Sequence, residues 1–177
     1  MGMWFIRRRA ELLFLLMSVT LSGCAFYSFS PSVTGDIKTI AIVLFENQTQ
    51  EFGITETLTQ GITDGFIQDN SLKVTTPEKA DALLSGTITG YDRKPYTFDQ
   101  QENVKEYIIR IYVKASLEKA KNKEQVWAAE KLEGWGTFRI AGDPNDPQLQ
   151  PETEEVARQR AIAKLAEDIV NRTVKSW

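Results

Sequence analysis

Histidine is missing from the sequence, and cysteine occurs once, as Cys24. Without histidine, the chain can form neither a serine–histidine–aspartate triad nor a cysteine–histidine pair, and it offers no imidazole to a metal ion. A single cysteine can form neither an internal disulfide nor a cysteine-based zinc cluster. The chain also lacks the patterns GxxxxGK[ST], GxGxxG and GxSxG, which mark phosphate sites, dinucleotide sites and nucleophile elbows. These absences predict a protein that is not an enzyme and needs no metal or cofactor.

Neither sign of charge predominates, because 21 lysines and arginines stand against 24 aspartates and glutamates, for a net charge of −3. This balance excludes a broadly basic nucleic-acid-binding protein, so we expect no nucleic-acid partner. Hydrophobic residues make up 42% and charged residues 25% of the chain. Such a composition is typical of a globular domain and not of a disordered chain.

An apolar run near the N-terminus, residues 12–21, follows three arginines at positions 7–9. A run of about ten residues is too short for a helix that crosses a bilayer, which takes roughly 20. The arrangement predicts a secretory signal peptide. The next residues, Leu21-Ser22-Gly23-Cys24, resemble the lipobox of bacterial lipoproteins, in which the chain is cut before the cysteine and the thiol is acylated. An ordinary signal peptide followed by an unmodified cysteine is the alternative.

We therefore expect a signal peptide over residues 1–23, a lipidated tether over residues 24–36 that begins at Cys24, and a folded domain over residues 37–177. Removing the signal peptide takes away three arginines and one glutamate, so the remaining 154 residues would carry a net charge of −5. Several acyl chains hold a protein firmly, because each buried methylene contributes about 0.8 kcal/mol. Ala25 follows the cysteine, and by resemblance to enteric lipoproteins this favours the periplasmic side of the outer membrane.

Hydrophobic periodicity predicts a chain order of strand, helix, several strands and helix. The expected strands cover residues 37–45, 72–75, 82–91, 107–117 and 125–140, and the expected helices cover residues 53–69 and 152–175. Residues 92–104 are expected to form a long polar loop, and a bulge is expected around residues 132–136. Two amphipathic helices and a sheet with one wet face predict an α+β fold, a two-layer sandwich with a mixed sheet and both helices on one face.

The chain resembles the LptE family of lipopolysaccharide-assembly lipoproteins over nearly all of the expected mature protein. The resemblance is carried by pattern and order in segments such as CAFYSFSP, IKTIAIVLFENQT, ITETLTQGITDGFIQDNSLKV, VKEYIIRIYVKASLEK and AIAKLAEDIVNRTVKSW. It implies an α+β sandwich that sits as a plug inside the outer-membrane β-barrel LptD. It also implies that the protein assists barrel assembly and lipopolysaccharide insertion, without a cofactor or covalent chemistry.

Lipopolysaccharide binding would need cations for its phosphates beside apolar surface for its acyl chains. The expected hairpin brings the loop 92–104 and the end of the return strand to one edge of the sheet, where four cations and two aromatic residues could converge: Arg93, Lys94, Lys105, Arg139, Tyr96 and Phe98. Each charge-assisted bond to a phosphate would add about 1.5–3 kcal/mol. The alternative is that these are ordinary solvated charges.

The opening strand IAIVLFENQT also resembles that of two other classes of envelope lipoprotein. One is the activator of penicillin-binding proteins, whose usual long disordered tether is missing here. The other is the pore family of curli secretion, which is disfavoured because no pair of alternating strands is spare for a membrane barrel. A tether of about twelve residues reaches at most roughly 40 Å, which holds the domain close to the membrane, as a barrel plug requires.

Overall fold

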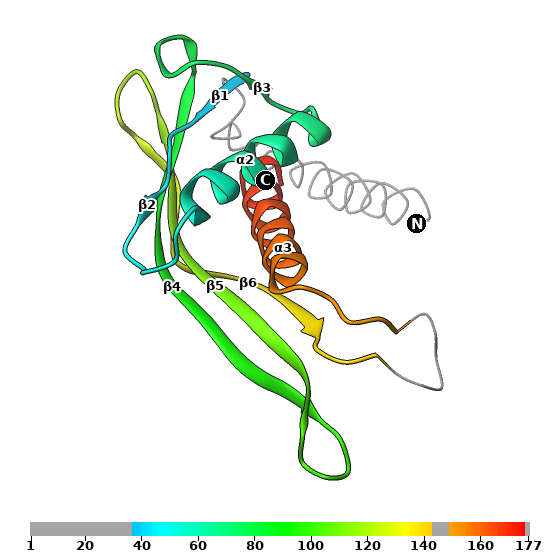
Figure 1. Ribbon diagram of the computed structural model, residues 1–177. Coiled ribbons are helices and arrows are strands. Elements are labelled where there is room, and N and C mark those ends of the chain that lie inside the picture. Colours follow the sequence, from blue (N-terminus) through cyan, green and yellow to red (C-terminus); the bar gives the residue numbers. More distant parts are fainter. Residues whose placement is uncertain (1–36, 143–148, 176–177) are drawn as a thin grey trace, which may run out of the picture. The chain divides into compact units, whose positions relative to one another are not determined.

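The computed structural model describes residues 37–142 and 149–175 (Figure 1). The expected signal peptide, Cys24 and the expected tether lie outside these residues. In the part of the chain that is described, no helix combines the length and apolar character needed to cross a membrane.

A mixed sheet forms one layer of the domain (Figure 1). Its strands run in the order β3-β1-β4-β5-β6, and β2 also pairs with β4. The strands are β1 (Thr39–Ile42), β2 (Glu46–Asn47), β3 (Lys73–Val74), β4 (Ala82–Phe98), β5 (Val104–Lys119) and β6 (Gln125–Arg139). The short strands β1, β2 and β3 pair in parallel, whereas β4, β5 and β6 form a long antiparallel meander.

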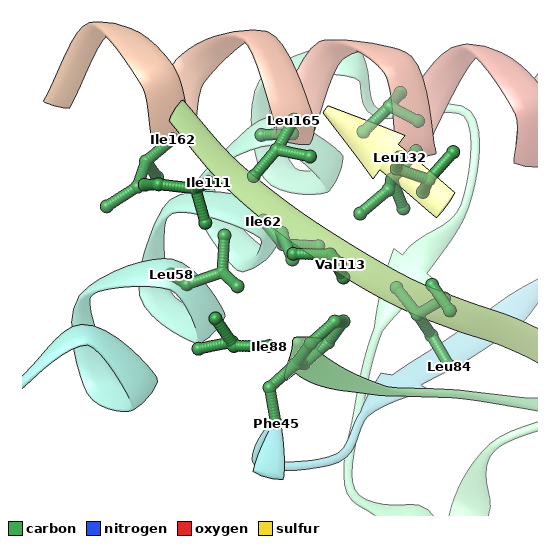
Figure 2. Close-up of a cluster of buried hydrophobic side chains, with 14 of the residues drawn as sticks. Phe45, Leu58, Ile62, Leu84, Ile88, Ile111, Val113, Leu132, Ile162 and Leu165 are labelled. Carbon is green, nitrogen blue, oxygen red and sulfur yellow. The ribbon is translucent and has the colours of Figure 1, made fainter. Parts of the chain in front are cut away.

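Two helices form the second layer, α2 (Ile54–Asp69) and α3 (Glu154–Val174), and a short 3₁₀ turn, η1 (Pro77–Lys79), precedes β4. Figure 2 shows how side chains from both helices meet those of the sheet in a single core. The fully buried side chains repeat every four residues on α2, at Ile54, Leu58, Ile62 and Phe66. Because both helices pack on the same apolar face, the predicted α+β two-layer sandwich is confirmed.

Glycines allow close contact at two places, one between the two helices and one between α3 and the sheet. Gly65 of α2 faces α3, where an added Cβ would lie 3.4 Å from the Cβ of Ala166. Gly134 and Gly136 of β6 face the backbone of α3, and an added Cβ at either position would fall on a carbonyl oxygen, that of Ala161 or Ala157. The helix α3 therefore lies directly on the β6 backbone, which no larger residue at positions 134 and 136 would permit.

Several predicted boundaries are wrong. The apolar run 37–45 yields only β1, and the polar residues Glu46 and Asn47, which lie outside the expected strands, form β2 beside β4. The buried Phe45 separates the two strands, because its ring fills the space that a side chain at Gly86 would take. The register shift on β6 falls between Ala129 and Leu132, just before the expected bulge.

The expected loop 92–104 is the largest error, because β4 and β5 continue through most of it. Polar residues extend the ladder there because they find partners across it, as when Thr97 Oγ1 donates to Glu106 Oε2 at 2.9 Å. The actual turn is closed by Asp99, whose Oδ1 accepts from the backbone N–H groups of Gln101 and Asn103, both at 2.8 Å. The side-chain amide of Asn103 also donates to Asp99 Oδ2 at 3.0 Å, and this bond, followed by the backbone bonds, holds the pKa of the Asp99 carboxyl below its ordinary value.

Candidate functional site

The four cations proposed for lipopolysaccharide are divided between the two faces of the sheet. Arg93 points toward the helices, with its guanidinium 4.5 Å above the ring of Tyr107 and its Nη1 3.5 Å from Oε2 of Glu154. Lys94 and Arg139 lie on the opposite, open face, because they stand beside β5 at Ile108 and Glu106 respectively. Their strands flank β5, so their Cα atoms are roughly 12 Å apart.

Carboxylates already engage three of these four cations. Besides the contact of Arg93 with Glu154, Lys94 Nζ lies 3.0 Å from Asp92 Oδ2 and Arg139 Nη2 lies 3.1 Å from Glu106 Oε1. The Arg139 pair is mostly covered, with side chains 22% and 21% exposed, whereas Lys94 is 66% exposed. An exposed pair is weak and exchanges readily with a competing anion, so Lys94 is far more available than Arg139.

The tip of the β4–β5 hairpin combines charge with exposed aromatic surface. Tyr96 and Phe98 are 50% and 55% exposed, and both lie at shifts of the β4–β5 register. Lys105 is the extra residue of β5 at the register shift between Thr97 and Phe98. Among the described residues it forms no ion pair within 4 Å. Lys94, Lys105, Tyr96 and Phe98 are called the tip cluster below.

The open face of the sheet is covered by cross-neutralised charges. Its ion pairs have N–O distances of 2.6–3.2 Å and join Asp92 to Lys94, Glu106 to Arg139, Arg110 to Glu133, and Lys114 to Glu130. The Nζ of Lys131 also lies 4.4 Å above the ring of Tyr112. Isolated surface pairs stabilise a fold little. Their consequence here is a polar face whose eight paired charges sum to zero.

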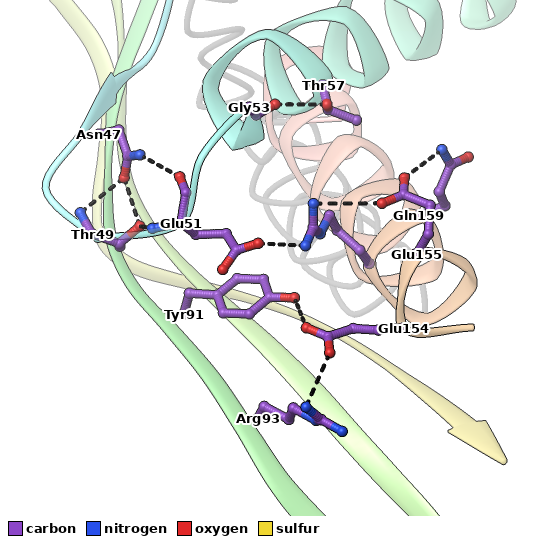
Figure 3. A network of polar contacts seen from close by, with 11 residues as sticks. Asn47, Thr49, Glu51, Gly53, Thr57, Tyr91, Arg93, Glu154, Glu155 and Gln159 are labelled. Atoms are coloured by element: carbon purple, nitrogen blue, oxygen red, sulfur yellow. Dashed lines mark hydrogen bonds and ion pairs between the residues drawn. The ribbon is translucent and has the colours of Figure 1, made fainter. Parts of the chain in front are cut away.

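A polar network joins the loop before α2 to β4 and to the start of α3 (Figure 3). The hydroxyl of Tyr91 donates to Glu154 at 2.8 Å, and Arg158 binds Glu51 and, at 3.5 Å, Glu155. Burial raises the pKa of the Tyr91 phenol to about 12, so this group stays neutral at physiological pH. The network links the loop before α2, β4 and the start of α3.

The carboxylates at the start of α3 all have structural partners. Glu152 binds Arg160 at 2.5 Å, a contact that holds the pKa of the Glu152 carboxyl below its ordinary value, and Glu155 accepts from Gln159 at 2.9 Å. In residues 37–142 and 149–175, no group of three or more carboxylate, cysteine or histidine side chains is placed to hold a metal ion. These bonds give each of the glutamates a structural role at the start of α3.

Sequence reasoning missed two features of the surface. The first is the set of ion pairs on the open face. The alternation of residues indicates that Arg110, Tyr112 and Lys114 share a wet face, but which charges meet there depends on the strand register. The second feature is Phe52, a lone aromatic residue in a polar loop, which is 93% exposed. Its position between polar residues was a usable signal.

A comparison with protein families found a match. The family model LptE, described as lipopolysaccharide-assembly, matches residues 37–173. No curated protein matches the chain.

Among solved structures, lipoprotein B from Nitrosomonas europaea aligns with a TM-score of 0.50 and 13% identity, over 79% of this chain and 84% of its own. The rare lipoprotein B from Shewanella oneidensis aligns with a TM-score of 0.48 and 15% identity, over 77% and 95% of the two chains. A minor lipoprotein from Acinetobacter baumannii aligns with a TM-score of 0.48 and 12% identity, over 79% and 92%. At these identities, the first of these shows a shared fold.

Proposed function

Because this chain belongs to the LptE family of lipopolysaccharide assembly, we propose that it is a lipoprotein of the outer membrane that binds an LptD-type β-barrel and assists insertion of lipopolysaccharide into the outer leaflet. In this proposal the protein acts by binding and catalyses no reaction. Residues 1–23 are the signal peptide, and Cys24 carries the lipid. Residues 24–36 tether the domain 37–177 on the periplasmic side.

The observation that carries the barrel part of the proposal is the neutral open face. A protein that plugs a barrel must present polar, hydrogen-bonding surface, because the interior of such barrels is polar. Unpaired charges buried in that contact would cost free energy, whereas the charges already paired between β5 and β6 do not have to find a partner. The open face of this sheet therefore suits burial against a polar wall.

The tip cluster supports the lipopolysaccharide part of the proposal. Lys94 and Lys105 supply cations for phosphate, and Tyr96 and Phe98 supply exposed apolar surface beside them. Arg93 and Arg139 complete the proposed binding end of the sheet, but a phosphate would have to displace Glu154 or Glu106 to reach them. We therefore assign most of the affinity to the two lysines.

The first experiment purifies the C-terminally tagged protein from membranes in mild detergent and identifies what accompanies it. A stoichiometric large β-barrel, together with acylated Cys24, is the expected result. A penicillin-binding protein in its place would favour the activator reading, and a ring of this protein alone would favour the pore. An unacylated Cys24 would contradict the proposed anchor.

The second experiment measures the dissociation constant for fluorescent lipopolysaccharide in detergent. Lys94→Ala with Lys105→Ala is expected to weaken binding about 100-fold or more, since each of the two charge-assisted contacts contributes about 1.5–3 kcal/mol. The matched control removes two lysines elsewhere, Lys73→Ala with Lys121→Ala, so that the net charge is equal in both variants. Equal affinities for the two double variants would refute the assignment to the tip cluster.

A further inference from the structure

Phe52 is the most exposed large hydrophobic residue of the described chain, at 93%. Two residues beyond it, Ile54 is fully buried, and on the other side of the loop Phe45 is 1% exposed. A single exposed apolar side chain on a surface is common and needs no explanation by itself. What distinguishes Phe52 is the rigid loop that carries it.

The loop between β2 and α2 is held by a closed set of hydrogen bonds (Figure 3). Asn47 Oδ1 accepts from the backbone N–H of Thr49 at 2.8 Å and from its hydroxyl at 2.7 Å, and Asn47 Nδ2 donates to the carbonyl oxygen of Glu51 at 2.9 Å. The carboxylate of Glu51 is in turn bound by Arg158 of α3. The residue just before Phe52 is therefore fixed through both its backbone and its side chain.

The residue after Phe52, Gly53, fixes the backbone on the C-terminal side of Phe52. Gly53 has a φ of +72°, a left-handed conformation that suits glycine, and its carbonyl oxygen accepts from the hydroxyl of Thr57 at 2.8 Å. Phe52 thus stands between two anchored neighbours on a preformed loop. Because little conformational entropy remains to be lost on binding, such a side chain suits the anchor of an interface.

The charge around Phe52 distinguishes between possible partners. No lysine or arginine occurs in the sequence between Lys38 and Lys73, whereas Glu46, Glu51 and Glu56 all lie within six positions of Phe52. Arg158, which reaches the loop from α3, is already bound to carboxylates. Anionic lipid head groups and lipopolysaccharide phosphates would be repelled, so a protein surface with an apolar pocket and hydrogen-bond donors on its rim fits better.

We propose that Phe52 is the anchor by which this protein docks into an apolar pocket of its β-barrel partner. This inference rests on the proposed function for the identity of that partner. It assigns to the loop between β2 and α2 a contact separate from the open face and from the tip cluster. Mutating an anchor of this kind is expected to weaken the complex about 30-fold, as for established interface hot spots.

The test places the photoreactive analogue p-benzoylphenylalanine at position 52 of the full-length protein in cells, and a cross-link to the barrel is expected. In parallel, the affinity of the Phe52→Ala variant for the barrel is measured in detergent against that of Ile67→Ala. Ile67 lies near the far end of α2 and is also exposed, at 59%, so it provides a matched loss of apolar surface. Unfolding midpoints of both variants should equal that of the wild type, which excludes misfolding as a cause.

Asn47→Ala supplies a second variant that leaves Phe52 in place but removes the side chain that orders the loop. If preorganisation matters, this variant should also bind the barrel more weakly, by less than Phe52→Ala. A normal affinity for Phe52→Ala would overturn the inference even if a cross-link forms.

The cross-linking result separates this inference from the proposed function. If the wild type co-purifies with the barrel but position 52 cross-links only to lipid, to a second copy or to another protein, the anchor is refuted and the proposed function stands. The same holds if position 52 cross-links to nothing. If the wild type recovers no barrel and position 52 captures none, both ideas fail.

Discussion

The close contact of α3 with β6 makes a sharp prediction for Gly134→Ala. The new Cβ would fall on the carbonyl oxygen of Ala161 and 2.6 Å from Cγ of Leu165, well inside ordinary contact distance. Because the first atom belongs to the backbone, rotating a side chain cannot relieve the clash, and α3 must move outward by about 1 Å. Overpacking of this kind costs about 1–3 kcal/mol. The substitution also recovers about 0.5–1 kcal/mol of the conformational entropy cost of glycine in a strand.

We therefore expect Gly134→Ala to lower the free energy of unfolding by about 1 kcal/mol. For a domain of this size, that corresponds to a melting temperature about 2–4 °C lower. Urea unfolding followed by circular dichroism measures the first quantity, and calorimetry measures the second. The loss should fall on stability and not on secondary-structure content, because the helix can still form after it moves.

Gly65→Ala is the matched control, since it adds the same methyl group to the other interface of α3. There the new Cβ would lie 3.4 Å from Ala166 Cβ and from Val170 Cγ2, which is tolerable contact. Alanine is also favoured over glycine within a helix by about 0.8–1 kcal/mol. Gly65→Ala should therefore stabilise the protein slightly. Equal stability of Gly134→Ala and the wild type would refute the direct packing of α3 on the β6 backbone.

Two further predictions concern single polar groups. Asp81 Oδ2 accepts from the backbone N–H groups of Lys38 and Thr39 at 2.9 Å and from the Thr39 hydroxyl at 2.8 Å, and these bonds hold the pKa of Asp81 below its ordinary 3.8. Because the pKa of Asp81 is lowered in the folded state, its carboxylate stabilises the fold at pH values above the unfolded-state pKa. At pH 7, Asp81→Ala should therefore lower the free energy of unfolding by about 1 kcal/mol. Urea unfolding at several pH values should show this difference between variant and wild type shrinking as the pH falls below 3.8. A pH-independent difference would contradict this account. Tyr91→Phe removes the 2.8 Å bond to Glu154 and should cost about 1 kcal/mol. In ultraviolet titration the variant should lose a tyrosine that ionises near pH 12, and loss of one that ionises near pH 10 instead would refute the burial of this phenol.

The helices were predictable because their signal is local and long. Four-residue spacing from Ile54 to Phe66 fixes one buried face, and Asn70 ends α2 in a left-handed conformation as an exposed helix end often does. The start of α2 was placed one residue early because Gly53 adopts a left-handed conformation and caps the helix without belonging to it. Each of these features depends only on residues close in sequence.

The extension of β4 and β5 through residues 92–98 could not be read from composition. Asp92, Arg93 and Lys94 look like a solvated loop, yet Arg93 stacks over Tyr107 on the neighbouring strand. That partner lies 14 positions away, and its alignment depends on the β4–β5 register. The register shifts near Tyr96 add further uncertainty, because each one reverses which residues share a face.

The positions of the four cations show the same limit in the functional site. Topology alone brings Arg93, Lys94, Lys105 and Arg139 to one end of the sheet, as expected from the sequence. Register then sends Arg93 to the helix side and Arg139 to the open face. Carboxylates at Glu154 and Glu106, which are distant in sequence, decide which cations stay available.

Phe52 was visible in the sequence, but its significance depends on the loop around it. An aromatic residue within polar sequence could fold inward to the core, as Phe45 does seven residues earlier. The hydrogen bonds of Asn47 and the contact of Glu51 with Arg158 hold the loop in a conformation that keeps Phe52 out of the core. Because these interactions hold the phenyl ring in water, the favourable free energy of burying that ring is still available to a binding partner. The open face is likewise prepared for binding, because its charges are already paired with one another before a partner makes contact.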